Sequence, residues 1–332
     1  MLHALSRFGR RRTLQGGAVA AVVLGLLLWW VLPLGEPEPS GSLTFSTGVR
    51  SGVYQLYGQR LEGSLAKDMP KVSIELQTSE GSQQNIERVA MGKADFTIAT
   101  ADAVTTYLQS GKPGGARLRG CVRLYDDYVQ LIVPRGSKIQ KVADLRGKRV
   151  GVGQKGSGVR LVADRLMTAA GVDPAGDITP VSAGIDTMPA RLMDDRLDAF
   201  FWSGGLPTGA VQELSERFAI RLVPLEDPLI TELQAAGGST RHYRSAVMPA
   251  DAYLNAQQGQ AVQTVAVANL LITTDRTDPL MTEAFTRTVI DSRDRIGREV
   301  HAAQLVDLRT AIYTDPLPLH EGAKRYYRSA KP

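Results

Sequence analysis

From residue 43 onward, short apolar strands alternate with amphipathic helices, and this alternation constrains the fold more than any other feature of the chain. Leu43 and Phe45 alternate with polar residues as in a strand, and apolar side chains between residues 53 and 65 then recur at helical spacing. The same order continues through residues 72–76, 86–90 and 96–98. Alternation of this kind predicts an α/β domain with a largely parallel sheet.

A second series of strands and helices begins at residue 129 and ends in a helical tail. Two α/β units and a tail predict two lobes. We expect residues 43–128 and 270–332 to form lobe 1, with the tail returning to it, and residues 129–269 to form lobe 2. Strands are predicted at 129–133, 149–152, 177–181, 198–202, 220–223 and 265–273, and helices at 157–170, 207–218, 279–296 and 299–311.

The N-terminus carries an export signal. Four arginines (Arg7, Arg10, Arg11 and Arg12) precede an almost uninterrupted apolar run over residues 18–32. A run of this length suits a short transmembrane helix or a signal peptide. The Arg11–Arg12 pair also allows a twin-arginine export signal, which leaves the export route open.

No small-x-small cleavage motif follows the apolar run. Residues 1–35 are therefore predicted to be an uncleaved signal anchor with its arginines in the cytoplasm, and residues 36–42 a stiff polar linker. The rest of the chain is then extracytoplasmic, in the periplasm or at the cell surface. We expect the segment at about residues 18–34 to span the cytoplasmic membrane and tether the protein to it.

Composition excludes several functions. The leader arginines supply four of the formal net charge of +5, so the remaining chain is near neutral and no nucleic acid partner is expected. The single cysteine, Cys121, excludes an internal disulfide. The four histidines do not pair at metal-binding spacing, and no G-x-S-x-G elbow occurs. Neither a catalytic site nor a metal site is predicted.

Gly151, Gly153 and Gly156 match the G-x-G-x-x-G pattern of dinucleotide-binding turns, after a predicted strand and before a predicted helix. The acidic partner of that pattern is missing, because Asp173 precedes the second strand of this unit, so no cofactor is expected. The turn and Ser157 still offer backbone N–H groups to an anion. Alternatively, Ser157 only caps the helix.

Two earlier turns, at residues 46–54 and 79–85, have the same character. Each follows a predicted strand and opens a predicted helix with small polar residues and glycines. Ligands of open α/β sheets bind at the carboxyl ends of strands, where such turns converge. Taken singly, each turn is a plain cap; together with the glycine turn they predict an anion site.

The order and spacing of these segments resemble the TAXI family of solute-binding proteins, the extracytoplasmic receptors of TRAP transporters. The resemblance implies a periplasmic-binding-protein type II clamshell, in which hinge strands join two α/β lobes that close on a small carboxylate or amino acid. The matching stretches are 46–58 (STGVRSGVYQLYG), 81–102 (GSQQNIERVAMGKADFTIATAD), 129–171, 198–214 (DAFFWSGGLPTGAVQEL), 265–273 and 319–328 (LHEGAKRYYR).

The resemblance also implies a set of ligand-binding residues. This chain departs from the family at Gln55 and Leu56, where tyrosine and proline are usual, and at Val159, where threonine is usual. Arg50 replaces a small residue, and either contacts the ligand or faces water. Trp202 is either a pocket wall or core packing. The implied ligand-binding residues are Thr47, Gly48, Val53, Tyr54, Ser82, Asn85, Gln154, Ser157, Gly158, Trp202, Gly205 and Pro207.

These features predict a monomeric solute-binding protein, not an enzyme, that captures a small organic anion or amino acid for the membrane subunits of a TRAP-type transporter. Two alternatives stay open. A membrane-anchored sensor or interaction module would use the same clamshell with a different partner. A nucleotide-dependent enzyme would use the glycine turn at residues 151–156.

Overall fold

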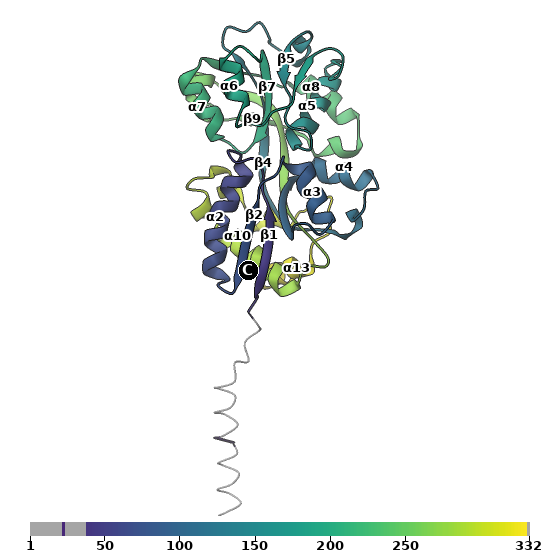
Figure 1. The fold of residues 1–332 in the computed structure, drawn as a ribbon, viewed down its shortest axis with the longest axis vertical. Coiled ribbons are helices and arrows are strands. Elements are labelled where there is room, and N and C mark those ends of the chain that lie inside the picture. The colour runs from purple at the N-terminus through teal and green to yellow at the C-terminus, as the bar shows by residue number, and fades with distance from the viewer. Residues whose placement is uncertain (1–21, 24–37, 331–332) are drawn as a thin grey trace, which may run out of the picture. The chain divides into compact units, whose positions relative to one another are not determined.

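The computed structural model describes residues 22–23 and 38–330, and residues 39–330 form one compact unit (Figure 1). Apart from residues 22–23, the predicted anchor lies outside the described residues, as do residues 36–37 of the predicted linker. The predicted linker end at residue 42 is wrong, because the first strand begins at Gly41 and pairs with the strand Val72–Gln77. In the part of the chain that is described, no helix is both long and apolar enough to cross a membrane.

The described body contains a ten-stranded mixed sheet in the order β2-β1-β3-β10-β4-β7-β5-β6, with β9 added to β10 and β8 to β4. The strands are β1 (Gly41–Ser46), β2 (Val72–Gln77), β3 (Phe96–Thr100), β4 (Leu118–Pro134), β5 (Arg149–Gly151), β6 (Thr179–Val181), β7 (Ala199–Gly204), β8 (Ile220–Val223), β9 (Arg244–Met248) and β10 (Val262–Thr274).

Helices cover the sheet at both ends of the body. In Figure 1, α5 to α8 surround β5 and β7 at one end, α2, α10 and α13 lie at the other, and β4 runs between them. The helices are α2 (Val53–Asp68), α3 (Ser82–Ala90), α4 (Ala101–Gln109), α5 (Gly158–Ala169), α6 (Met188–Met193), α7 (Gly209–Arg217), α8 (Asp227–Ala235), α9 (Leu254–Gln257), α10 (Pro279–Asp291), α11 (Arg293–Ile296), α12 (Leu308–Ala311) and α13 (Glu321–Ser329), with short 3-10 turns η1 (Gly115–Arg117), η2 (Val142–Leu145), η3 (Gly238–His242) and η4 (His301–Leu305).

The expectation of a largely parallel sheet is wrong at its centre. β1 is parallel to β2 and β3, and β5 is parallel to β6 and β7. β10, however, is antiparallel to β3, β4 and β9, and β4 is antiparallel to β7 and β8. Two long strands therefore run through the middle of the body in opposite directions. Only residues 129–133 of β4 were predicted, because Asp126 and Asp127 interrupt its apolar pattern.

Apolar packing gathers in two large clusters that share these long strands. One cluster combines residues 43–125 with residues 271–327, and the other spans residues 129–267. A third, smaller cluster lies around α3 and α4. The ring of Phe285 on α10 stacks on Phe96 of β3, with ring centroids 4.2 Å apart. The helical tail thus packs against the first strands of the chain. The lobe boundaries at 128/129 and 269/270 stay a prediction, and this clustering supports them.

Three helix boundaries differ from the prediction. The helix expected from Pro207 begins at Gly209, because Thr208 takes the N-cap position. The helix expected at 279–296 breaks between α10 and α11 at Ser292. The helix expected at 299–311 consists of η4 and the short α12.

Candidate functional site

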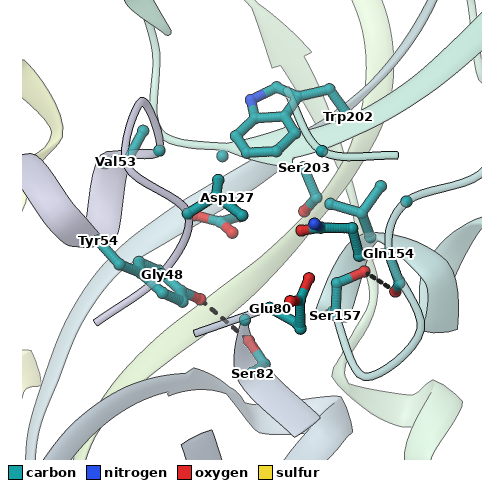
Figure 2. A pocket seen from close by; sticks show the side chains of 18 of the residues that line it. Gly48, Val53, Tyr54, Glu80, Ser82, Asp127, Gln154, Ser157, Trp202 and Ser203 are labelled. Atoms are coloured by element: carbon teal, nitrogen blue, oxygen red, sulfur yellow. Dashed lines mark hydrogen bonds between the residues drawn. The ribbon is translucent and has the colours of Figure 1, made fainter. Parts of the chain in front are cut away.

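A pocket lies where the carboxyl ends of β1, β2, β3, β5, β6 and β7 meet (Figure 2). It encloses about 590 Å³ of empty space, including the part open to solvent. This is the position at which open α/β sheets bind ligands. Its lining residues are Gly48, Val49, Gly52, Val53, Tyr54, Glu80, Gly81, Ser82, Thr100, Asp127, Gly153, Gln154, Ser157, Gly158, Val159, Ala183, Gly184, Met188, Trp202, Ser203 and Gly204.

Most of the residues implied by the family resemblance meet in this pocket. The three turns predicted from the sequence do converge, although they belong to segments up to a hundred residues apart. Of the twelve implied residues, eight line the pocket: Gly48, Val53, Tyr54, Ser82, Gln154, Ser157, Gly158 and Trp202.

Thr47 and Asn85 lie behind the pocket wall and do not line it. The Thr47 hydroxyl contacts Gln55 and donates to the carbonyl of Gln77 at 3.1 Å. The Asn85 amide donates to the carbonyls of Thr47 at 2.6 Å and Ile98 at 3.0 Å, and its oxygen accepts from Ser46. Both side chains are fully buried. They hold the first turn against α3 and have no group left for a ligand.

Gly205 and Pro207 also lie outside this pocket. They line a separate cavity, together with Arg50 and His301. A Cβ on Gly205 would lie 2.6 Å from the Cβ of Ala302, so this glycine permits close packing against η4. Arg50 therefore does not face the site that its neighbours Gly48 and Val53 form.

Ser157 caps α5, as its alternative interpretation predicted. Its hydroxyl donates to the carbonyl of Gln154 at 2.7 Å and accepts from the Arg160 amide at 3.0 Å. No donor remains on this hydroxyl for an anion. The N–H groups of Gly158 and Val159 in the first turn of the helix have no partner among the described residues. The amides of α5 are thus free to bind an anion.

The first turns of α3 and α5 touch each other at the pocket. A Cβ on Gly81, whose φ is +123°, would lie 3.3 Å from the Cα of Ser157. The backbone N–H of Gln84 donates to the carbonyl of Gly156 at 3.0 Å, and the side-chain amide of Gln83 donates to the carbonyl of Ser157 at 2.7 Å. These contacts place α3 against the glycine turn, in the space that the pyrophosphate of a bound dinucleotide would occupy. The turn is therefore poorly suited to a nucleotide.

Trp202 fulfils both of its alternative roles. Trp202 lines the pocket, as Val53 and Met188 do, and also belongs to the larger apolar cluster. The indole N–H donates to the Thr208 hydroxyl at 2.9 Å, so the ring is held in one orientation. It forms a fixed apolar wall, opposite the polar turns in Figure 2.

A chain of hydrogen bonds crosses the polar side of the pocket. The Thr100 amide donates to the Ser82 hydroxyl at 3.2 Å, and that hydroxyl lies 3.2 Å from the Tyr54 hydroxyl. Tyr54 donates to the side-chain oxygen of Asn269, and the Asn269 amide donates to Asp127 at 2.6 Å. Since the Tyr54 proton is used toward Asn269, Ser82 donates to Tyr54. Every bond in the chain thus points toward the Asp127 carboxylate.

Asp127 is a site residue that the sequence interpretation missed. It lies on β4 and is only 4% exposed. Strand alternation could have identified it, since it shares the buried face of Tyr125 and Val129. Glu80, Thr100 and Ser203 were also missed, because single polar residues in turns carry no distinguishing pattern.

Burial raises the pKa of Asp127 to about 7. The hydrogen bond from Asn269 lowers this pKa, while the nearby charges of Asp126 and Asp102 raise it. The Ser203 hydroxyl is near enough to lower it slightly, yet it makes no hydrogen bond of acceptable geometry. Asp127 is therefore a carboxyl whose charge is costly unless a further partner stabilises it.

Two buried hydroxyls at the pocket lack hydrogen-bond partners. These are Thr100, which is 3% exposed, and Ser203, which is 8% exposed. Buried polar atoms are nearly always paired, so unpaired ones at a pocket mark positions for ligand contacts. Within residues 38–330, no group of three or more His, Cys, Asp or Glu residues is placed to hold a metal ion.

Comparison with known proteins identifies the fold and the family. A protein of Bordetella bronchiseptica RB50 has a similar structure, with a TM-score of 0.50, 16% identity and coverage of 90% of this chain and 92% of that one. An ancestral arginine-binding protein bound to arginine gives a TM-score of 0.50 at 15% identity, covering 78% and 98%. The alkanesulfonate-binding protein of Xanthomonas axonopodis pv. citri gives 0.48 at 18% identity, covering 90% and 86%.

The two structures with a TM-score of 0.50 agree with an α/β periplasmic-binding-protein type II fold for this chain. The NMT1-like family matches residues 45–330, nearly the whole described body. This family consists of binding proteins without enzymatic activity. The chain therefore belongs to the NMT1-like family of TAXI/TRAP-type solute-binding proteins and is an extracytoplasmic solute-binding protein of the transporter type.

Proposed function

We propose that this protein captures a small organic acid or amino acid in its pocket and presents the closed form to the membrane subunits of a TRAP-type transporter. One observation carries the proposal. The pocket combines unpaired backbone N–H groups of α5 with the buried, unpartnered hydroxyls of Thr100 and Ser203. Such groups bind a carboxylate in a water-poor site.

The environment of the pocket suits a small amphipathic solute. Val53, Met188 and Trp202 provide apolar surface in the pocket lining. Contacts between α3 and the glycine turn close one side of the pocket. A solute held there would be largely desolvated, which strengthens each hydrogen bond that it makes. We further propose that the protein acts as a monomer tethered to the membrane by the segment before residue 36.

Thermal melting of the full-length chain tests the binding function. The panel contains dicarboxylates, keto acids, amino acids and nucleotides. A ligand that binds only the native state stabilises it by RT ln(1 + [L]/Kd), so at least one organic acid or amino acid should raise the Tm. A panel in which none of these compounds shifts the Tm, or in which nucleotides alone do, contradicts the proposal.

A pair of variants locates the binding site. Ser203→Ala should weaken binding of the compound found, because its hydroxyl lines the pocket without a partner. Ser292→Ala is the matched control, since Ser292 is also buried and unpartnered but does not line the pocket. Equal affinities in the two variants would place the ligand elsewhere.

A further inference from the structure

The pocket is acidic. Its lining contains two carboxylates, Glu80 and Asp127, and no lysine, arginine or histidine. We propose that Asp127, assisted by Glu80, binds an ammonium group of the ligand, and that the ligand is an α-amino acid and not a dicarboxylate or keto acid that lacks an amino group. This inference rests on the proposed function and assigns a chemical class to the solute.

Basic residues near the pocket are directed elsewhere. Arg160 pairs with Asp164 at 2.7 Å, and Arg165 pairs with Asp102 at 3.0 Å. Arg50 and Lys155 line other cavities. None of these cations is placed to neutralise the two pocket carboxylates. A ligand that carried only negative charges would therefore enter a site of its own sign.

The position of Asp127 suits a cation. It is buried, and its one hydrogen-bond donor of good geometry is Asn269, bound to Oδ1. No hydrogen bond within the described residues engages Oδ2. The hydrogen bonds that run from Ser82 through Tyr54 to Asn269 all donate toward this carboxylate. The Asp127 carboxylate is therefore a hydrogen-bond acceptor in this arrangement. Buried carboxylates need a charged or multiply donating partner, and an ammonium group provides both.

Glu80 adds a second acceptor. Its side chain points into the pocket in Figure 2 and forms no ion pair with any described residue. The side chain is only half-buried, at the start of the turn that leads into α3. An ammonium group carries three donors, and Oδ2 of Asp127 together with the two Glu80 oxygens can accept all of them.

The carboxylate of an amino acid has a separate place in the same pocket. A Cβ on Gly158 would lie 3.1 Å from the Ser82 hydroxyl and 3.4 Å from that of Thr100, so these groups surround the free amides of α5. Tyr54 joins this end to the acidic end, through Ser82 on one side and Asn269 on the other. The two ends of a zwitterion thus meet complementary groups on one wall.

Calorimetry with paired compounds tests the inference on the unmodified protein. The pairs are glutamate with 2-oxoglutarate, alanine with pyruvate, and alanine with ethylamine, which lacks the carboxylate. The amino acid of at least one pair should bind about 30-fold or more tightly than its counterparts, because each counterpart leaves a buried charged or polar group unpaired. Keto acids or dicarboxylates that bind as well as amino acids would overturn the inference but leave the proposed function intact.

Variants separate the roles of neighbouring carboxylates. Asp127→Asn should weaken binding of the amino acid by about 30-fold or more. Asp126→Asn is the control: its carboxylate pairs with Arg123 at 2.7 Å and with Arg244, outside the pocket, and the affinity should change less than about threefold. Should Asp127→Asn fail to fold, Glu80→Gln provides the same comparison. Undiminished binding in the pocket variants would overturn the inference, whereas binding of no acid or amino acid would overturn the proposed function itself.

Discussion

The guanidinium of Arg165 on α5 lies 3.0 Å from the carboxylate of Asp102 on α4, in a pair whose side chains are only 18% and 2% exposed. Arg165 also donates to Thr106 at 2.7 Å, to Ser239 at 2.5 Å and to the Tyr243 hydroxyl at 2.8 Å. Tyr243 in turn donates to Asp102 at 2.6 Å. This network joins residues predicted to belong to different lobes, so separation of the lobes would break it.

Arg165→Met should lower the free energy of unfolding by about 3–5 kcal/mol, because it leaves the buried charge of Asp102 unpaired. Urea unfolding followed by circular dichroism measures the change. Arg160→Met is the control on the same helix, since its pair with Asp164 is about one-third exposed, and should cost less than about 1 kcal/mol. An equal loss of unfolding free energy in the two variants would show that Arg165 does little to stabilise the buried Asp102 carboxylate.

Ser157→Ala should lower the stability by about 1 kcal/mol and leave ligand affinity nearly unchanged. The reason is that the Ser157 hydroxyl is fully used in capping α5. Melting curves give the stability and calorimetry gives the affinity. A loss of affinity without a loss of stability would mean that this hydroxyl contacts the ligand after all.

Gly158→Ala should weaken ligand binding by about tenfold or more, since its Cβ would lie among the Ser82 and Thr100 hydroxyls at the free amides of α5. Gly63→Ala, within α2 and with open space around its Cβ, should not affect binding and should stabilise the helix by about 0.5–1 kcal/mol. Titration calorimetry on both variants makes the comparison. Unchanged affinity in Gly158→Ala would exclude a ligand at this end of the pocket.

Ionisation of Asp127 should lower the stability of the ligand-free protein as the pH rises from about 4 to 7. Asp127 has a pKa of about 7 in the folded state against 3.8 as its ordinary value, so between these values the folded state binds more protons than the unfolded state. The carboxylate faces Tyr54 of α2 and Asn269 of β10, with Asp126, Asp102 and Glu80 as the nearby acids. Since the pKa of Asp127 differs by about three between the folded and unfolded states, its ionisation lowers the free energy of unfolding by about 4 kcal/mol.

Asp127→Asn should remove this component of the pH dependence, because asparagine does not ionise. Urea unfolding at pH 5 and pH 8 compares the two proteins, with Asp126→Asn as the control. The ligand-free Asp127→Asn protein should be the more stable one at pH 8. A difference between the two pH values that persists unchanged in this variant would assign the dependence to other groups.

Local periodicity was sufficient to predict many elements of the fold. The strands around Phe45 and Phe96, and the helix from Val53, were correctly placed because burial of one face imposes a repeat of two or 3.6 residues on the sequence. The order of polar turns was also sufficient to indicate the family. The part of β4 that contains Asp126 and Asp127 was not predicted, since its buried polar residue breaks that repeat.

The sequence by itself determined many of the strand and helix segments, the three turns that line the pocket and the family, because each of these depends on residues close together in the chain. Only the tertiary structure decided which side chains face the pocket. It placed Asn85 behind the wall and Asp127 in it, and it joined Tyr54 to Asn269, which is 215 residues away. The physical reason is that such contacts depend on the register and direction of β4 and β10, which are set by packing between distant segments.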